Sequence, residues 1–391
     1  MPTASLRASS SVGADSQRPE VDAEAFLEEG AELRLGGSRL NGAVRLPADL
    51  LQSRHWAVRT FSKRHVYFVK VPKEVNEYNS SNCSFARFAT QQEATQAARY
   101  PLDAFVEAMA NEAKSRGSKA RMVILVTVMR SGSTLLTKML HHEGKTLAIS
   151  EPSSLFSLCH AYVKGWWKTD AELLDGVVAA TLEFLRRHVP PEQTLILKCG
   201  PTFIPLAVNV KRLFGEDARF LFNFRKKGGR RALERFLRGQ SHDDWNFCLM
   251  RVAHRFPWLV NSLLAGRRFR EEITRHKPKN LVELSQVYHL TSYRHYLDNR
   301  GLFDGDMILY ECLIANPRAT LLEPMSLCGL EPEVYMERAL EQLQVDSQQG
   351  THLSRQRLGR VDATDEVDRE KLLELALRLG FSVEEAQEFT E

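Results

Sequence analysis

The stretch Arg121–Gly144, RMVILVTVMRSGSTLLTKMLHHEG, decides the fold class. Its first part, MVILVTV, is a continuous run of apolar and β-branched residues, which is typical of a strand buried on both faces of a parallel sheet. The run stops at Met129–Thr134, MRSGST, and a helical pattern covers Thr134–His142. A strand, a glycine-containing turn and a helix in this order indicate one unit of an α/β fold.

The rest of the chain repeats this alternation of strand and helix patterns. We therefore predict an α/β domain whose parallel sheet is flanked by helices. The further predicted strands are 146–150, 194–199, 219–224 and 307–313. The predicted helices are 169–188, one ending at Phe214, stretches of 229–300, one capped at Asn316-Pro317, one ending at Gly380 and one opened by a Ser382–Glu385 capping box.

The 391 residues suit one large α/β domain with extra segments. We predict a disordered tail at 1–20, an N-terminal extension or subdomain at 21–115, and the main domain at 116–391. In the extension, His65–Val71 alternates like a strand, and 91–117 is rich in helix formers with a break at Pro101.

The sequence contains no apolar run near the ~20 residues that cross a bilayer, and its N-terminus lacks a signal-peptide core. Its six cysteines form no CxxC pair and show no metal-ligand spacing with histidine. We therefore expect a cytoplasmic protein with reduced thiols, no membrane span and no metal site.

The net charge of the chain is only +4, but it is unevenly distributed. Between Lys211 and Arg238, ten Lys or Arg residues stand against three acidic residues. One basic cluster in a nearly neutral chain favours a small polyanionic ligand over a nucleic acid, which would need a continuous basic surface.

The turn after the first buried strand has the composition of an anion-binding site. A turn that opens a helix presents free backbone N–H groups and the positive end of the helix dipole. Gly132 allows the backbone to curl around a ligand, Ser131, Ser133 and Thr134 add hydroxyl donors, and Arg130 adds a forked positive charge. Together they predict a nest for phosphate or sulfate.

Two other interpretations of this turn exist. It could be an ordinary capped turn, with Ser133 or Thr134 as N-cap and Arg130 in solvent. It is not a Walker A loop, although Gly144-Lys145-Thr146 has the right ending, because Met139 stands where the first glycine is required and the triplet follows the helix. A kinase or NTPase is therefore disfavoured.

Three segments in order resemble the sulfotransferase family, nearest to its arginine-containing carbohydrate and trehalose-type branch. MRSGSTLL is similar to the family's 5′-phosphosulfate loop, and RFLFNFRKKGGRRALERFL resembles the strand that ends in the arginine gripping the 3′-phosphate. LYECLIANPRATLLEPMSLCGLEPE is similar to the family's late strand-helix segment. The resemblance covers residues 120 to about 345.

This resemblance implies a P-loop-like fold and transfer of a sulfuryl group from 3′-phosphoadenosine 5′-phosphosulfate (PAPS), without a metal. Arg130 would stabilise charge on the oxygen that bridges phosphate and sulfate, the turn backbone would hold the 5′-phosphate, and Arg225 would hold the 3′-phosphate. The implied PAPS-binding residues are Arg130, Ser131, Gly132, Ser133, Thr134 and Arg225.

An acceptor hydroxyl needs a general base, and the resemblance points to Glu151 at the end of the second strand. Glu151 could equally be a structural carboxylate paired with an arginine. His141 and His142 are alternative bases, although such helical pairs commonly face solvent. Lys198 could help neutralise the sulfate or could be a surface lysine.

The sequence departs from the family after Arg225. The family pattern is R-[DN]-P-[RK] with a serine eight residues after the arginine, whereas this chain has Arg225-Lys226-Lys227-Gly228 and Leu233. The basic cluster could therefore also be a solvated helix face. Further possible contacts, which a linker or core packing would also explain, are His352, Ser354, Arg355, Trp166, Trp167, Trp245 and Phe247.

Two functions remain open. One is an enzyme that sulfates a hydroxyl or amine of a small-molecule or carbohydrate acceptor. The other is a catalytically inactive descendant that binds a nucleotide or a protein. The sequence determines neither the acceptor nor the oligomeric state.

Overall fold

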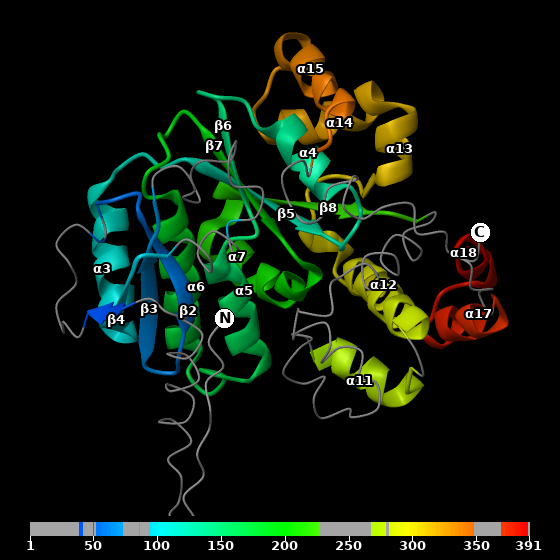
Figure 1. Ribbon diagram of the computed structural model, residues 1–391, viewed down its shortest axis with the longest axis horizontal. Helices are drawn as coiled ribbons and strands as arrows, with labels where there is room; N and C mark the ends of the chain where they lie inside the picture. Colours follow the sequence, from blue (N-terminus) through cyan, green and yellow to red (C-terminus); the bar gives the residue numbers. More distant parts are fainter. Residues whose placement is uncertain are drawn as a thin grey trace, which may run out of the picture.

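The structure is a computed structural model of the 391-residue chain. It describes residues 39–41, 50, 52–72, 86, 94–226, 267–278, 281–347 and 369–389. Within them the chain forms two sheets, one of five strands and one of four (Figure 1).

The five-stranded sheet is parallel throughout, with strand order β6-β7-β5-β8-β9. This confirms the predicted α/β class with a parallel sheet flanked by helices. Its strands are β5 (Arg121–Thr127), β6 (Thr146–Ser150), β7 (Thr194–Cys199), β8 (Ala218–Phe224) and β9 (Ile308–Leu309). The register pairs Thr127 with Asn223 and Ser150 with Lys198, so the carboxyl ends of the strands meet at one edge.

Helices cover both faces of this sheet because β5 alternates its side chains between two apolar clusters. Met122, Ile124 and Val126 pack into one cluster, and Val123 and Leu125 pack into the other. The first face is covered by α5 (Ser153–Val163), α6 (Ala171–Arg186), the 3-10 helix η2 (Pro201–Leu206), α7 (Ala207–Phe214) and α12 (Leu281–Asp298). The second is covered by α4 (Ser133–Leu140), α14 (Pro317–Leu327) and α15 (Pro332–Glu341).

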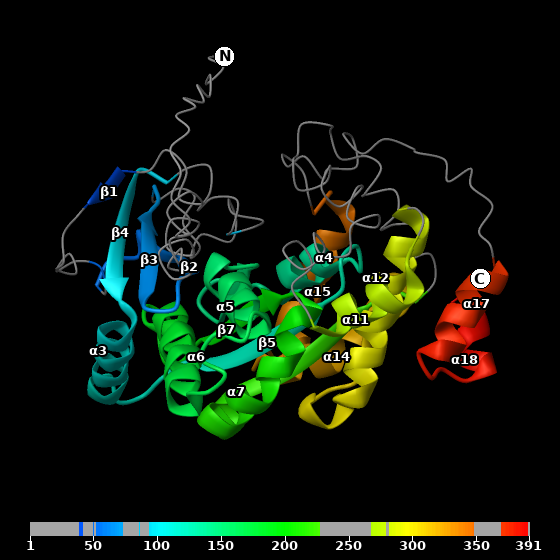
Figure 2. The same ribbon diagram turned by 90° about the horizontal axis from the view of Figure 1, so that it is seen from below.

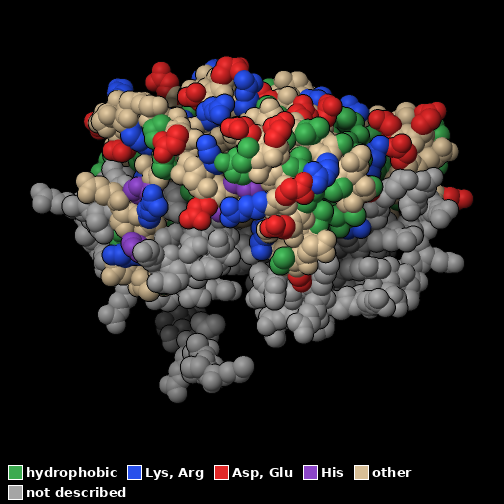
Figure 3. Space-filling view, turned by 90° about the horizontal axis from the view of Figure 1, so that it is seen from above, with side chains coloured by type: hydrophobic (Ala, Val, Ile, Leu, Met, Phe, Trp, Pro, Cys, Tyr) green, Lys and Arg blue, Asp and Glu red, His purple; other side chains and the backbone are tan. Residues whose placement is uncertain are grey.

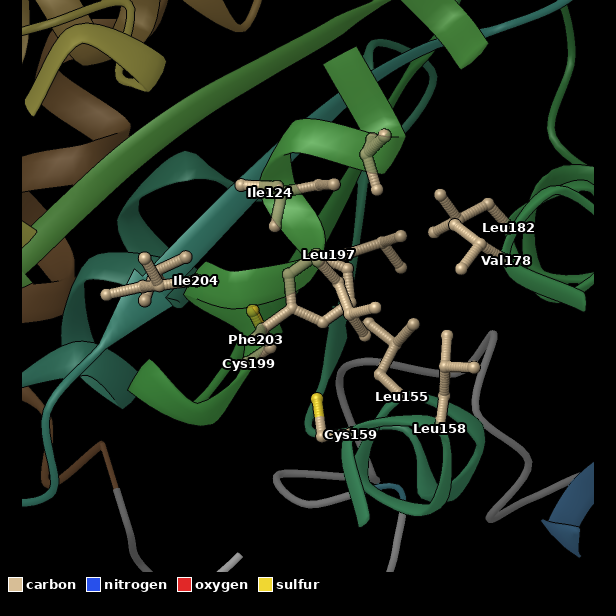
Figure 4. Packing of buried hydrophobic residues seen from close by; sticks show 14 of the residues in the cluster. Ile124, Leu155, Leu158, Cys159, Val178, Leu182, Leu197, Cys199, Phe203 and Ile204 are labelled. Carbon is tan, nitrogen blue, oxygen red and sulfur yellow. The ribbon is translucent and has the colours of Figure 1, made fainter. Parts of the chain in front are cut away.

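Figure 4 shows the first cluster where β5 and β7 meet α5 and α6. Leu155 and Leu158 of α5 face Leu197 of β7, with Phe203 of η2 beside them. Each of these four side chains is buried. The sheet edge that carries the turn after β5 is therefore supported by tightly packed apolar residues.

The four-stranded sheet lies in the N-terminal region and has the order β1-β4-β3-β2. Its strands are β1 (Arg39–Asn41), β2 (Trp56–Phe61), β3 (His65–Lys70) and β4 (Gln96–Pro101), and α3 (Leu102–Ser115) follows. Figure 2 shows this sheet beside α3 and α6. Phe68 of β3, Phe105 of α3 and Phe184 of α6 pack against one another, so the N-terminal sheet joins the core of the main sheet.

Two predicted elements need correction. The segment predicted as helix-rich before Pro101 contains strand β4, because residues 96–101 pair with the strand predicted at His65–Val71, which is confirmed as β3. The strand predicted at 307–313 is wrong beyond Leu309. Residues 308 and 309 pair with the last two residues of β8, and helix α13 (Tyr310–Ala315) starts where that pairing ends.

The C-terminal helices pack against β8 through aromatic rings. Phe224 stacks on His289 and Tyr293 of α12, with ring centroids 4.4 and 4.8 Å apart, and contacts Phe389 edge-on at 6.5 Å. The elements here are α11 (Arg267–His276), α17 (Arg369–Arg378) and α18 (Val383–Glu388). The predicted helix end near Gly380 and the Ser382–Glu385 capping box are both confirmed.

Acidic and basic side chains are interspersed with apolar ones on the face shown in Figure 3. Within the described part of the chain, no helix combines the length and hydrophobicity that crossing a bilayer requires. The predicted tail 1–20 and the helical stretches predicted within 229–266 lie outside the described residues.

Asp304 ties the start of β8 to the segment before β9. Its carboxylate accepts hydrogen bonds from Lys211 Nζ at 2.7 Å, Arg219 Nη1 at 2.8 Å and the backbone N–H of Phe220 at 2.6 Å. Burial alone would raise the pKa of Asp304, but the bonds from Lys211, Arg219 and Phe220 outweigh burial and hold this pKa below its ordinary 3.8. A carboxyl with a depressed pKa stabilises the fold above its unfolded pKa and loses this contribution as the pH falls through the folded value.

We therefore expect Asp304→Asn to lower the free energy of unfolding by about 1–2 kcal/mol near pH 7. The difference from the wild type should shrink as the pH falls from about 3.8 downwards, because the wild-type carboxyl then also becomes neutral. Urea denaturation near neutral pH and near pH ~3 measures this. The control is Asp306→Asn, whose exposed carboxylate pairs with Arg300 and should matter little at either pH. Equal losses in both variants would contradict the prediction.

Candidate functional site

The turn between β5 and α4 curls sharply at two residues. Arg130 has φ 65° and Gly132 has φ 75°, a backbone region that few residues other than glycine adopt. Ser131 is fully buried, and its hydroxyl oxygen lies 2.5 Å from Asn223 Oδ1 and 2.7 Å from the Val128 carbonyl oxygen, the two acceptors for its single proton. The Ser131 side chain therefore holds the turn onto β8 and is directed into the protein, whereas we expected it to add a hydroxyl donor for the ligand.

Helix α4 begins at Ser133, and its N-cap is Gly132. This overturns the ordinary-turn interpretation with Ser133 or Thr134 as N-cap. No side chain among the described residues caps this helix end. The backbone N–H groups of Ser133, Thr134 and Leu135 belong to its first turn, where an α-helix has no internal acceptors for them. This helix end can therefore bind an anion.

Two arginines that follow neighbouring strands lie at this turn: Arg130 belongs to it, and Arg225 packs on Tyr310, whose ring lies against Gly132. Burial lowers the pKa of Arg130, and the nearby positive charge of Arg225 lowers it further, while Tyr310 and Asp346 act in the opposite direction. Arg130 is half-buried, so it does not extend freely into solvent as the ordinary-turn interpretation required. The structure thus brings together the two arginines that the sequence placed at the ends of different strands. An anion between them would relieve their repulsion.

Arg225 is the first residue after β8, and its guanidinium carbon lies 4.6 Å from the ring centroid of Tyr310. The following Lys226 forms an ion pair with Glu388 of α18. The remainder of the basic cluster, from Lys227 to Arg238, lies outside the described residues, as does Leu233. The described end of β8 therefore presents Arg225 to the turn and directs Lys226 towards the C-terminal helix.

Lys198, near the end of β7, is buried and connects three parts of the sheet edge. Its ammonium lies 3.1 Å from Glu151 Oε1, and it donates to Ser150 Oγ at 3.2 Å and to Thr134 Oγ1 at 3.3 Å. The side chain of Lys198 is 1% exposed and that of Glu151 is 27% exposed. The surface-lysine interpretation is therefore wrong. An ammonium has three N–H donors, and here three oxygens accept from it.

Glu151 follows β6 with φ 52°, and its backbone N–H donates to the carbonyl of Lys198 at 3.0 Å. A positive φ at a residue other than glycine costs on the order of 1 kcal/mol or more, so the surroundings hold this carboxylate in place. Glu151 is a paired carboxylate, as one interpretation predicted, but its partner is Lys198 and not an arginine. The ammonium of Lys198 contacts both the Glu151 carboxylate and the Thr134 hydroxyl at the start of α4, and it therefore connects the two.

The alternative bases lie elsewhere. His141 is the C-cap of α4, and His142 follows it, so both stand at the end of the helix opposite the Gly132 turn. Eight residues of α-helix span ~12 Å. His142 is buried, not solvent-facing, and burial lowers the pKa of both imidazoles. The structure does not bring these histidines to the turn.

Trp166 and Trp167 are core residues, as the core-packing alternative predicted. Both are nearly buried, Trp167 packs edge-on against Phe61, and its indole N–H donates to the Lys63 carbonyl. The other candidate contacts lie outside the described residues; they are His352, Ser354, Arg355, Trp245 and Phe247.

The described cysteines Cys159, Cys199, Cys312 and Cys328 are free thiols. Burial raises the pKa of Cys159 to about 12 and that of Cys199 well above its ordinary value, which makes both poor nucleophiles. Among the described residues, no three His, Cys, Asp or Glu side chains gather as they would around a metal ion.

Two residues at this edge were given no role in the sequence analysis. Asn223, the β8 partner of Thr127, accepts from Ser131 and donates through Nδ2 to the Ile308 carbonyl at 3.0 Å. Tyr310 packs against Gly132 and Arg225. Asn223 could have been recognised because it is a polar amide within the buried strand RFLFNF. Tyr310 could not, because it lies in a segment that we predicted as a strand.

The comparisons with known proteins found similar solved structures. No protein-family model matches the chain, and no curated protein is significantly similar in sequence. A sulfotransferase from Alicyclobacillus acidocaldarius shares 13% identity at a TM-score of 0.38, over 67% of this chain and 93% of that one. Sulfotransferase STF1 from Mycobacterium tuberculosis shares 12% identity at a TM-score of 0.38, over 74% and 80%.

Proposed function

We propose that this protein is a PAPS-dependent sulfotransferase acting on a hydroxyl or amine of a small-molecule or carbohydrate acceptor. One observation carries the proposal: the uncapped first turn of α4 follows Arg130, and the ring of Tyr310 packs both on Gly132 of this turn and on Arg225 after β8. A helix N-terminus with two guanidinium groups suits a ligand that carries more than one phosphate or sulfate group.

The residues at this edge fit the two ends of the nucleotide. The backbone N–H groups that open α4 would hold the 5′-phosphate, and Gly132 has the conformation that lets the chain curl around it. Arg130 would stabilise the negative charge that develops on the leaving phosphate, and Arg225 would hold the 3′-phosphate. PAPS itself supplies the activated sulfuryl group.

Glu151 is the proposed general base. The ammonium of Lys198, 3.1 Å away, holds the Glu151 carboxylate at the sheet edge, where it would accept a proton from the acceptor. The partial exposure of Glu151 leaves it reachable by an acceptor. We also propose a cytoplasmic location and the division into a tail at 1–20, an extension at 21–115 and a sulfotransferase-like domain at 116–391.

One observation favours a second candidate, a catalytically inactive nucleotide or protein binder. Lys226, next to Arg225, is paired with the carboxylate of Glu388. This acidic partner reduces the positive charge available to a 3′-phosphate, at the position where the sequence already departs from the family pattern.

Calorimetric titration with the product nucleotide, 3′-phosphoadenosine 5′-phosphate (PAP), tests the proposal. We expect micromolar binding by the wild type, at least tenfold weaker binding in Arg130→Ala, and a similar loss in Arg225→Ala, because each removes a charge-assisted contact to phosphate. Arg318→Ala is the control, since this arginine pairs with Glu337 on the exposed surface. The absence of PAP binding by the folded wild type would sink the enzyme proposal. PAP binding without turnover in an acceptor screen would favour the inactive binder.

A further inference from the structure

Tyr310 stands between the two proposed phosphate-binding elements. It is the first residue after β9, and Arg225 is the first residue after β8. These strands are parallel neighbours whose register pairs Phe224 with Leu309. The register therefore places Tyr310 and Arg225 side by side at the carboxyl edge of the sheet.

The ring of Tyr310 contacts both neighbours closely. The guanidinium carbon of Arg225 lies 4.6 Å from the ring centroid, within the range of a cation–π interaction. A Cβ atom added to Gly132 would lie 2.3 Å from Cδ2 and 2.6 Å from Cε2 of Tyr310. The ring thus packs directly on the backbone of the β5–α4 turn, and it connects this turn to Arg225.

Arg225 needs such support for two reasons. It lies beyond the end of its strand, and a free arginine side chain has large rotamer entropy that binding would have to remove. It also stands near a second positive charge, because the pKa of Arg130 is lowered by burial and then by Arg225. A flat aromatic surface restricts the guanidinium and stabilises its charge without using its N–H groups as hydrogen-bond donors.

We propose that Tyr310 is a positioning residue that holds Arg225 beside the Gly132 turn, so that the site selects a nucleotide with a 3′-phosphate over one that carries only a 5′-phosphate. This inference rests on the proposed function, since it assigns Arg225 to the second phosphate. It adds to that function a residue through which the 3′-phosphate contributes to the binding affinity.

The test compares the affinities for PAP and for adenosine 5′-monophosphate, which lacks the 3′-phosphate, in the full-length protein. We expect the wild type to bind PAP more tightly than the monophosphate, and Tyr310→Phe to keep this preference because it keeps the ring. Tyr310→Leu should reduce the preference about tenfold while changing monophosphate affinity less than about threefold.

A second variant tests the same contact from the other side. Arg225→Lys keeps the charge but loses the planar group that stacks on the ring, and it should reduce the preference for PAP to a similar extent. This variant leaves Tyr310 on Gly132, so it remains informative if Tyr310→Leu fails to fold. Adding Tyr310→Leu to Arg225→Ala should have no further effect on the preference, because the ring then has no guanidinium to position.

The possible outcomes distinguish a failure of this inference from a failure of the proposed function. A wild type that binds neither nucleotide overturns both. A wild type that prefers PAP, with the preference intact in Tyr310→Leu or Arg225→Lys, overturns the role of Tyr310 alone. An equal loss of both nucleotides in Tyr310→Leu also overturns it, because the ring would then contact the part of the ligand that the two share.

Discussion

Replacing Gly132 with alanine is expected to abolish PAP binding and to lower the free energy of unfolding by about 2–4 kcal/mol. Two costs combine at this position. An alanine at φ 75° is strained by about 1 kcal/mol, and its methyl group would lie 2.3 Å from a ring carbon of Tyr310. Relieving this overlap displaces the ring and with it Arg225, so the loss of binding should exceed what the loss of stability explains.

Gly144→Ala is the matched control for this substitution. Gly144 has nearly the same backbone conformation, φ 78°, but no atom lies within 4 Å of an added Cβ. It should therefore carry the backbone cost of about 1 kcal/mol and leave PAP binding unchanged. Urea denaturation and calorimetric titration of both variants measure the difference. Equal stability losses in the two, or wild-type PAP affinity in Gly132→Ala, would show that the contact with Tyr310 is unimportant.

Replacing Glu151 with glutamine is expected to lower the free energy of unfolding by about 3 kcal/mol, because it leaves a buried ammonium without its negative partner. Lys198 is 1% exposed, so water cannot take the place of the carboxylate. Lys198→Met should cost less, about 1–2 kcal/mol, since the carboxylate that remains is 27% exposed and can be hydrated. The double substitution should cost less than the sum of the two, as expected for residues in direct contact.

Denaturant unfolding of the wild type, the two single variants and the double variant gives this coupling directly. Glu337→Gln, which breaks the exposed pair with Arg318, is the control and should change stability by less than about 0.5 kcal/mol. The assignment of a buried pair fails if Lys198→Met is the more damaging change or if the two effects add. PAP binding should survive Glu151→Gln, because the proposed base contacts the acceptor and not the nucleotide.

The main sheet could be predicted because its central strands are short, mostly apolar runs. MVILVTV, TLILKC and RFLFNF each lie within or next to a buried strand, and the turns after them carried the polar residues that mark the site. Arg130, Gly132 and Arg225 could be proposed from sequence alone, since residues that follow parallel strands meet at one edge.

The errors occurred where distant pairing outweighs local preference. QAARYP contains good helix formers, yet it forms β4 because β3 and β1 lie on either side of it. LYECL is apolar enough for a strand, but no described strand continues alongside it after Leu309, and it forms a helix. Contacts between distant parts of the chain also limited the prediction of the site. The burial of Lys198 depends on oxygens from β6 and α4, and the position of Tyr310 depends on the register of β9 with β8.

The aromatic packing around Phe224 also sets an order of events during protein synthesis. The ring of Phe224 contacts Tyr293 of α12 and Phe389, the residue that follows α18. The ring of Phe224, beside Arg225, therefore gains its contact with Phe389 only after α18 has emerged from the ribosome. Until then the parts of Phe224 and Tyr293 that Phe389 contacts lack this cover, and exposed aromatic surface is the kind that chaperones bind.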